Sequence, residues 1–351
     1  MRRSGSVWLA LCLLLSACGG GGGLAQPAST PTSHNNVSST FAPFQFPTLS
    51  SDQLGTDPII TSTTQPPDTT MLQVVHQGSG PAIKPGGMVV VDYKGQPWEP
   101  SGAQLSPFVD TFAGGDLFAS SIDKVVPGWS KKMPGVTVGS RVLLVVPPSD
   151  AFGIHPPKNA NILPNDTLMF VIDVLDTFPP DQGPAGTPVA AHDSALPTAG
   201  GTTDPKVTIP TGAPPKTLQQ ELLVRGKGDK VADGQWLVVQ YTGLIWATGK
   251  IFDSTWTRSY GPTPIAIRLS ESDRLNGQRA ANSLAGVIKG LVGHTVGSRV
   301  LLVIPPDEGY GAAGNPSAGV SGTDTMVFVI DILGAYRSGD HSTASPTPPA
   351  G

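Results

Sequence analysis

Aromatic residues gather around one aspartate in each half of the chain. In the second half, Asp253 follows Phe252 directly, and Tyr241 ends an apolar run shortly before them. Tyr310 and Phe328 come later in the same half. Apolar side chains with a few polar groups among them are typical of a small-ligand pocket. Taken singly, each residue also has an ordinary structural role, because Phe side chains fill cores and Asp side chains cap turns.

The sequence lacks the motifs of the common enzyme classes. It contains no H-E-x-x-H, no G-x-S-x-G, no P-loop and no close pair of cysteines. The 6 histidines are scattered without ligand spacing, so we expect neither a metal nor a cofactor. The formal net charge is -4 and no basic run occurs, which argues against nucleic acid as a partner.

The candidate pocket residues belong to a repeated framework. Residues 138–148 and 296–306 have nearly the same sequence, and residues 166–175 and 324–333 form a second matching pair at the same offset of 158. A repeat of this length is too long for a solenoid unit. We therefore interpret it as two copies of one domain, which the length of 351 residues allows.

Each copy is predicted to contain several strands and one short helix. Strands are expected where β-branched apolar runs are bounded by Gly and Pro, at 71–75, 88–93, 218–224, 236–241, 299–304 and 325–333. The last two runs are largely apolar, so both of their faces are expected to be buried at the centres of the strands. Helix candidates lie at 127–133 and 284–291. Together these elements predict an α+β fold in which an antiparallel sheet covers the helix.

Composition places the domain boundaries. The folded units are predicted at 69–178 and 216–336, each near the usual size of a domain. The rest of the chain is rich in Gly, Pro, Ser and Thr. This composition predicts a disordered tether at 19–68, an extended linker at 179–215 and a disordered tail at 337–351.

Residues 1–18 have the pattern of an export signal. Two arginines precede an apolar stretch that is too short to span a bilayer. The stretch ends in Leu-Ser-Ala-Cys, which resembles the lipobox of bacterial lipoproteins. This resemblance implies cleavage before Cys18, acylation of Cys18 and an exported protein held by lipid at the cell envelope. An ordinary secretory signal with an incidental cysteine is the alternative.

Ordered motifs in the second copy carry a specific resemblance to a known family. The motifs are Tyr241-Thr242-Gly243, 249–254, 290–299, Tyr310-Gly311 and 325–328. In order and approximate spacing they resemble the FKBP-type peptidyl-prolyl isomerases. The resemblance covers nearly all of 216–336 and, less completely, 69–178. It implies two domains, each a curved antiparallel sheet of five or six strands wrapped on a short helix, with the substrate proline between sheet and helix.

The resemblance assigns a substrate pocket in the second copy. Its lining residues would be Tyr241, Phe252, Asp253, Leu284, Val287, Tyr310 and Phe328. In the family, the backbone N–H at the place of Leu284 and the phenol at the place of Tyr310 bind the substrate carbonyl. Arg258 matches an arginine that pairs with the pocket aspartate. Val287 stands where the family usually has tryptophan, so this pocket is expected to be deeper and less aromatic.

The first copy departs from the family in other ways. The equivalent substrate-binding residues would be Tyr93, Asp110, Val126, Trp129, Phe152 and Phe170. Trp129 retains the tryptophan of the family, whose ring forms the floor of the pocket. Phe152 replaces the phenol, and Val109 stands in the place of the family's Phe. We therefore expect the activity mainly in the second copy.

The implied reaction suits these residue types. An X–Pro bond rotates over a barrier of roughly 18–20 kcal/mol because of amide resonance, and uncatalysed exchange takes on the order of 10–100 s. A dry apolar pocket favours the twisted amide, so neither a nucleophile nor a general base is needed, and Asp253 is not expected to be one. We expect a monomeric isomerase of proline-containing polypeptides. The alternative is a non-catalytic module that binds proline peptides or holds unfolded chains.

Overall fold

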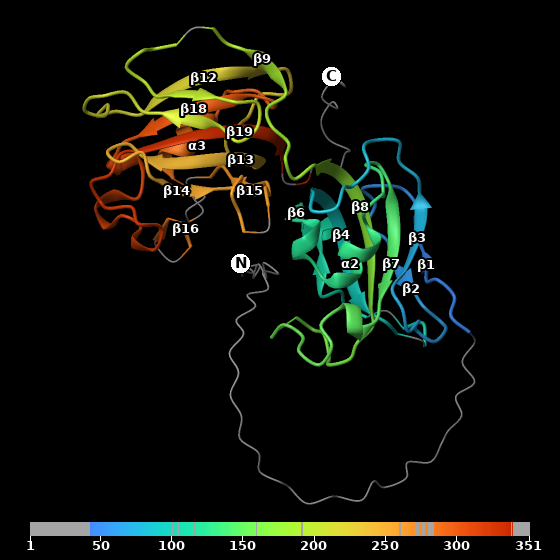
Figure 1. Ribbon diagram of the computed structural model, residues 1–351. Helices are drawn as coiled ribbons and strands as arrows, with labels where there is room; N and C mark the ends of the chain where they lie inside the picture. Colours follow the sequence, from blue (N-terminus) through green and yellow to red (C-terminus); the bar gives the residue numbers. More distant parts are fainter. Residues whose placement is uncertain are drawn as a thin grey trace, which may run out of the picture.

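The computed structural model describes residues 43–99, 101–103, 105–114, 117–158, 160–190, 192–259, 261–270, 274–275, 278–279, 284–337 and 339 (Figure 1). The expected signal segment, the lipidation residue Cys18 and the first part of the tether lie outside these residues, as does nearly all of the tail. Within the described residues, no helix is long and apolar enough to cross a membrane.

The first domain is an antiparallel sheet on one short helix. The strands follow the order β3-β7-β8-β4-β5, and β6 also pairs with β4. Their bounds are β3 (Met71–His76), β4 (Met88–Pro97), β5 (Val109–Asp110), β6 (Phe118–Ser121), β7 (Arg141–Val146) and β8 (Leu168–Phe178). The helix against the sheet is α2 (Pro127–Lys132), and a single turn, α1 (Thr111–Gly114), follows β5.

The second domain repeats this plan with one strand more. Its sheet has the order β14-β13-β19-β18-β12-β9, and β15 also pairs with β13. The bounds are β9 (Gly186–Pro188), β12 (Gln219–Gly226), β13 (Trp236–Ile245), β14 (Ile251–Ser254), β15 (Ile265–Arg268), β18 (Arg299–Ile304) and β19 (Met326–Tyr336). Helix α3 (Ala285–Leu291) lies against this sheet, and a two-stranded ribbon, β16 (Arg274–Leu275) with β17 (Gln278–Arg279), lies apart from it. The predicted α+β class with a helix on an antiparallel sheet is confirmed.

Glycines on the helices face the strands and let helix and sheet approach closely. A Cβ atom on Gly286 would lie 2.6 Å from the side chain of Ile304, and one on Gly290 would lie 2.5 Å from Leu302. In the first domain, a Cβ on Gly128 would lie 2.5 Å from Val146. Real Cβ atoms do not make such contacts, so glycine is needed wherever helix and sheet meet at this distance.

The outer face of the first sheet is covered by a segment predicted as disordered. Residues 43–68, here called the first strap, contain the paired strands β1 (Thr48–Leu49) and β2 (Ile60–Thr61). Ile60 and the phenylalanines Phe44 and Phe46 pack against an apolar patch of the sheet, made of Leu143, Val145, Met169 and Val171. The prediction of a tether over 19–68 is therefore wrong for this part. The physical reason is that the apolar strands β7 and β8 need cover on both faces.

The chain between the domains covers the second sheet in the same way. Residues 179–215, the second strap, contain β9 and the hairpin of β10 (Thr198–Gly200) and β11 (Lys206–Thr208). Leu196, with Val207 and Ile209, packs on the outer patch formed by Leu301, Val303, Val327 and Val329. The segment is therefore folded over the domain that follows it, and the predicted extended linker is corrected.

A buried ion pair anchors each strap. Arg141 binds Asp173 through Nε at 2.6 Å and donates to the Ser51 carbonyl at 3.1 Å and the Thr56 carbonyl at 2.9 Å. In the second domain, Arg299 Nε lies 2.6 Å from Asp331.

Arg299 also donates to the carbonyls of the second strap. Its partners are Gly201 and Thr203, the second at 2.7 Å. Each guanidinium thus donates hydrogen bonds to a carboxylate in the sheet and to two carbonyls in the strap. Because both domains have this arrangement, the repeated unit includes the strap.

The two sheets meet through equivalent patches. Val90 of β4 and Val238 of β13 lie in one buried cluster with Leu175, Leu333 and Tyr336. Phe178 and Met88 belong to the same cluster. The Tyr336 hydroxyl donates to Asp176 Oδ2 at 2.8 Å across this contact. The domains are therefore packed against one another at the ends of their central strands.

Candidate active site

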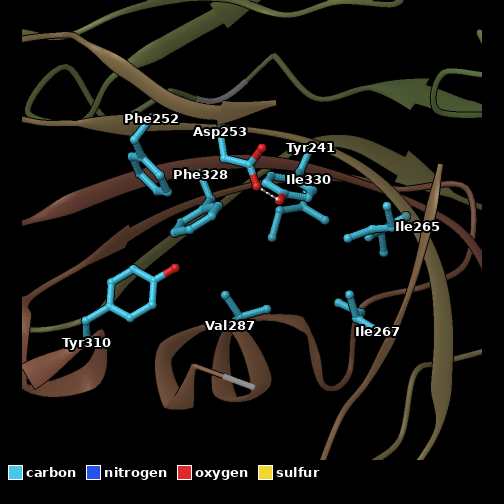
Figure 2. A pocket seen from close by; sticks show the side chains of 10 residues that line it. Tyr241, Phe252, Asp253, Ile265, Ile267, Val287, Tyr310, Phe328 and Ile330 are labelled. Carbon is cyan, nitrogen blue, oxygen red and sulfur yellow. Dashed lines mark hydrogen bonds between the residues drawn. The ribbon is translucent and has the colours of Figure 1, made fainter. Parts of the chain in front are cut away.

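The second domain has a pocket between the inner face of its sheet and helix α3 (Figure 2). Its lining comes from β13, β14, β15, β19, the helix and the loop after β18. The lining residues are Val239, Tyr241, Phe252, Asp253, Ile265, Ile267, Val287, Tyr310, Phe328 and Ile330. Six of the predicted residues therefore line one pocket: Tyr241, Phe252, Asp253, Val287, Tyr310 and Phe328.

Aromatic and aliphatic side chains form the walls. Phe252 meets Phe328 edge to face, with ring centroids 5.5 Å apart and planes at 84°. Tyr241 lies 6.0 Å from Phe328. Val287 projects from the helix below them, and Ile267 closes the pocket on the side of β15 (Figure 2). A ring the size of proline would therefore meet only carbon atoms on most sides.

The polar groups of the pocket form one chain of contacts. Tyr241 donates its hydroxyl hydrogen to Asp253 Oδ2, and Arg258 Nη1 lies 2.8 Å from Asp253 Oδ1. Burial raises the pKa of Tyr241 above its ordinary range, and the hydrogen bond to Asp253 raises it further. Tyr241 therefore remains a donor. Because both oxygens of Asp253 are engaged, the carboxylate is a fixed acceptor rather than a free base.

Tyr310 and Leu284 occupy different places at the helix side. Tyr310 directly precedes a short 3-10 turn, and its hydroxyl points towards the centre of the pocket (Figure 2). Leu284 is the N-cap residue of α3, and its side chain is fully buried in the core rather than in the pocket wall. The role predicted for Leu284 rests on its backbone N–H and stays a prediction.

Four lining residues were missed from the sequence. Val239 and Ile330 lie two positions from Tyr241 and Phe328 on their strands, so they face the same side of the sheet. That period of two was the available signal. Ile265 and Ile267 come from β15, at the start of a loop that has no counterpart of equal length in the first copy. Their place could not be read from the repeat.

The strand register shows which residues of the first domain are equivalent. Gly95 pairs with Val109, whereas Gly243 pairs with Asp253. The next hydrogen bond agrees with this alignment. Thr111 accepts from the backbone N–H of Tyr93 at 2.8 Å, as Thr255 accepts from Tyr241 at 2.8 Å. Val109 therefore stands in the place of Asp253.

Two predictions for the first domain are corrected by this register. Asp110, expected in the pocket, lies one residue further on, where successive side chains point to opposite faces. It forms an ion pair with Lys94 at 3.0 Å, and Lys94 also binds Asp57 of the first strap. Phe108, not Val109, takes the place of Phe252. It meets Phe170 edge to face at 5.7 Å and 81°.

Aromatic rings line the site of the first domain. Trp129 is buried on α2 and meets Tyr93 at 5.3 Å and Phe170 at 5.4 Å, both nearly edge-on. Phe118 takes the register position of Ile265 and lies 5.2 Å from Tyr93. Val126 is buried as the N-cap of α2, and Phe152 is partly buried against the same cluster.

The phenol of the first domain lacks the carboxylate partner of the second. Burial alone raises the pKa of Tyr93 to about 12, and Val109 cannot accept its hydrogen. Trp129 Nε1 is buried with no hydrogen-bond partner in the described part of the chain. In that part, no three His, Cys, Asp or Glu side chains come together as a metal site would require.

Comparison with known proteins agrees with this geometry. The family model for FKBP-type peptidyl-prolyl cis-trans isomerase matches residues 80–175 and 227–333. An FK506-binding protein of Streptomyces anulatus is 31% identical over 129 residues, which cover 37% of this chain and 94% of that protein. The peptidyl-prolyl cis-trans isomerase FKBP9 of Mus musculus is 24% identical over 258 residues, covering 69% of this chain and 37% of that protein.

A solved structure with related sequence is that of FkpA from Escherichia coli. It is 33% identical, with a TM-score of 0.27, over 31% of this chain and 48% of that chain. The family model covers more than half of the present chain and occurs once in each domain. The chain thus belongs to the FKBP-type peptidyl-prolyl cis-trans isomerases and carries two copies of their domain.

Proposed function

We propose that the second domain performs the isomerisation and that its substrates are exported polypeptides folding at the cell envelope. The observation that carries the first part is the contact chain of Tyr241, Asp253 and Arg258 beside an apolar pocket. The first domain has Val109 in the place of the carboxylate and Phe152 in the place of the pocket phenol Tyr310. We therefore assign it peptide binding with weak or no catalysis.

The chemistry needed is a modest lowering of a rotational barrier. Bringing exchange from about 10–100 s to milliseconds requires about 10⁴-fold, or roughly 5–6 kcal/mol. Planar amides carry separated charge that water stabilises, and twisting removes it. A pocket walled by Phe252, Val287 and Phe328 withholds that water and so favours the twisted state.

The polar groups then have positioning roles. The Tyr310 hydroxyl is placed to donate to a substrate carbonyl, and Tyr241 and Arg258 hold Asp253 in one orientation. No proton has to leave the substrate, which fits a carboxylate whose two oxygens are already engaged. Hydrogen bonds to the residues beside the proline would hold the twist.

Catalysis in the second domain is tested with proline-limited refolding of a model substrate. The full chain is compared with a variant that combines Asp253→Ala and Tyr310→Phe. The proposal expects loss of most of the acceleration, while circular dichroism stays unchanged. Full activity in the double variant would refute the assignment.

The envelope location is supported by the sequence of residues 1–18. An export signal ending at Cys18 would leave a protein anchored by acyl chains. Metabolic labelling with palmitate in the source bacterium tests this, with Cys18→Ala as the control. The proposal expects label in the membrane fraction and loss of that label in the variant. Absence of the label from both the parent chain and the Cys18→Ala variant would reject the lipid anchor.

A second function is favoured by the substitutions in the first domain. A site without a carboxylate or a pocket phenol but with the aromatic floor of Trp129 suits binding of proline peptides without catalysis. The tandem arrangement would then raise the local concentration of a client beside the second domain. Saturable proline-peptide binding without rate enhancement in the double variant described above is the discriminating result.

A further inference from the structure

The two domains differ at one edge of their sheets. In the second domain, β9 of the second strap pairs with β12, which is also paired with β18. The equivalent strand of the first domain is β3, which pairs with β7 and, within the described residues, has no strand on its other side. A strand edge of this kind presents N–H and C=O groups that can pair with a further strand. The open edge of β3 is therefore a place where an extended segment can bind.

The pairing shows that β3 and β12 are equivalent residue by residue. His76 pairs with the strap-anchoring arginine of the first domain as Val224 pairs with that of the second, and a bulge directly precedes each of them. In the second domain, β9 covers Val224–Gly226. The matching residues of the first domain are His76–Gly78. The edge that β9 closes in one domain thus exists with the same local geometry in the other.

Exposure differs between the two edges. His76 is exposed, whereas Val224 is half-buried. Gly78 is half-buried, whereas Gly226 is buried. Backbone groups that become buried need hydrogen-bond partners. Whatever covers the first edge must therefore bring N–H and C=O groups of its own, as another strand does.

The two straps match in sequence and in contacts. Phe46-Pro47-Thr48 corresponds to Leu196-Pro197-Thr198 at an offset of 150. Each triplet leads into a hairpin, β1 with β2 or β10 with β11, and the first residue of each triplet packs on the outer patch of its sheet. At the same offset, Nη1 of the anchoring arginine donates to the carbonyl of Ser51 or Gly201. The straps are therefore copies of one element.

This match predicts what precedes the hairpin of the first strap. In the second strap, β9 comes before the triplet. At the offset of 150, the chain before the first strap has Asn36–Ser38, which lie outside the described residues. This stretch has no charged residue and a valine at its centre, which suits a short strand. It is as far along the chain from its hairpin as β9 is from its own, so it has the length to reach the same edge.

We propose that Asn36–Ser38 bind the open edge of β3 as an antiparallel strand, in the register of β9 on β12. Ser38 would then face His76, as Pro188 faces Val224. The interaction is separate from the proline pockets. It does not depend on isomerisation or on acylation at the end of the signal segment.

An occupant from the same chain has an advantage over a separate molecule. A segment joined to the domain by a short linker acts at an effective concentration that is roughly millimolar, so a few backbone hydrogen bonds hold it in place. Binding would also hide the edge from a second copy of the chain or from another polypeptide. Residues 19–35 would remain as the tether, and the first domain would be attached to it through β3.

The first experiment is a disulfide cross-link in the full chain carrying Cys12→Ser and Cys18→Ser. Val189 donates to Leu223 at 2.9 Å in the second domain, so the neighbouring residues 188 and 224 form a pair without hydrogen bonds. Such pairs bring the Cα atoms to about 4.5 Å, which suits a disulfide. Ser38→Cys with His76→Cys should therefore cross-link within one chain under mild oxidation.

Two further cysteine pairs calibrate this result. Pro188→Cys with Val224→Cys is the positive control, because the structure shows these strands paired. Val37→Cys with His76→Cys should cross-link much more slowly, because adjacent side chains of a strand point to opposite faces. The linked peptides are identified by mass spectrometry after proteolysis.

Hydrogen exchange at the Gln77 amide is the second measurement. Its equivalent Arg225 pairs with Thr187 of β9. Val37→Pro removes the N–H at the residue matched to Thr187, and exchange at Gln77 should become about tenfold faster. Ser38→Pro should leave the rate nearly unchanged, because the second strap itself has a proline at the matching position.

Three results would overturn the proposal. The first is a Ser38→Cys and His76→Cys pair that cross-links no faster than the pair with Val37→Cys. The second is a cross-link that forms only between chains, which would mean that a second copy covers the edge. The third is a Gln77 amide that exchanges equally fast in the parent chain and in Val37→Pro.

Discussion

Val109 occupies in the first domain the register position that Asp253 occupies in the second. Each faces a glycine of the central strand, Gly95 in one domain and Gly243 in the other. The carboxylate that accepts from Tyr241 thus has no counterpart beside Tyr93. One register position separates a complete contact chain from an incomplete one, and the proposed difference in catalysis between the domains rests on it.

Asp253→Val converts the second site into the pattern of the first. We expect a fall in kcat/KM of about 10–100-fold, because a charge-assisted hydrogen bond and the orientation of Tyr241 are lost. The fold should lose about 1–3 kcal/mol, since the Tyr241 hydroxyl is left without an acceptor. Refolding kinetics of a proline-limited substrate measure the first effect and urea unfolding the second. An unchanged kcat/KM would contradict the role of the contact chain.

The pocket phenol is tested with a matched pair of variants. Tyr310→Phe removes the hydroxyl that its counterpart Phe152 lacks. We expect kcat/KM to fall about 2–10-fold, because one neutral hydrogen bond to the substrate is lost. Phe152→Tyr adds a hydroxyl to the first domain, where Val109 is still present. It should leave the activity of the chain nearly unchanged. A large gain from Phe152→Tyr would mean that the first domain lacks only this group.

The strap anchors predict a strong effect on stability. Arg299→Leu leaves Asp331 buried without its partner and frees the strap carbonyls, so the second domain should lose about 3–5 kcal/mol. Lys206→Ala removes an exposed ion pair in the same strap and should cost at most about 1 kcal/mol. Urea unfolding compares the two. Equal effects would show that the strap is not held through the buried arginine.

The contact between the domains is expected to depend on pH. Burial raises the pKa of Asp176 from its ordinary value of 3.8 to about 6, against the opposing hydrogen bond from Tyr336. A raised pKa means that the packed state binds the proton more tightly. The stabilisation is therefore complete below pH 3.8 and is lost as the pH rises through about 6, a change of roughly 3 kcal/mol.

Asp176→Asn isolates this effect. The variant keeps a side chain of the same shape without the charge, so its stability should fall less than that of the parent chain between pH 4 and 7. The fall that remains is expected from Asp331, whose pKa burial also raises to about 6. At pH 7 it should be the more stable of the two. Thermal unfolding at several pH values measures the difference. If the pH dependence of the parent chain persists in the variant, another group is responsible.

The domain fold could be predicted from the sequence because each strand is marked by an apolar run within its own residues. The apolar runs 299–304 and 325–333 are strands, and their apolar character on both faces correctly indicated two covered faces. What covers the second face was not predictable. Residues 43–68 and 179–215 have the composition of disordered chain, and their order comes from contacts with Arg141 and Arg299 far away in the sequence.

The sequence brought the pocket residues together where the family motif is continuous, and it misplaced a residue where one position of register decides; the roles of the pocket residues stay predictions. Tyr241, Asp253 and Tyr310 meet in one pocket as expected. In the first copy, Asp110 was matched to the pocket aspartate because it is acidic, although it lies one position beyond the pocket. A shift of one residue moves a strand side chain to the other face, and no sequence signal marked that shift between Asp110 and Val109.

The direct test of the central claim compares one disabling change per domain in the full chain. Asp253→Val with Tyr310→Phe disables the second site, and Trp129→Leu alters the floor of the first. In proline-limited refolding, we predict that the second-domain variant loses nearly all acceleration and that Trp129→Leu retains it. Retention by the former and loss by the latter would place catalysis in the first domain and contradict the account.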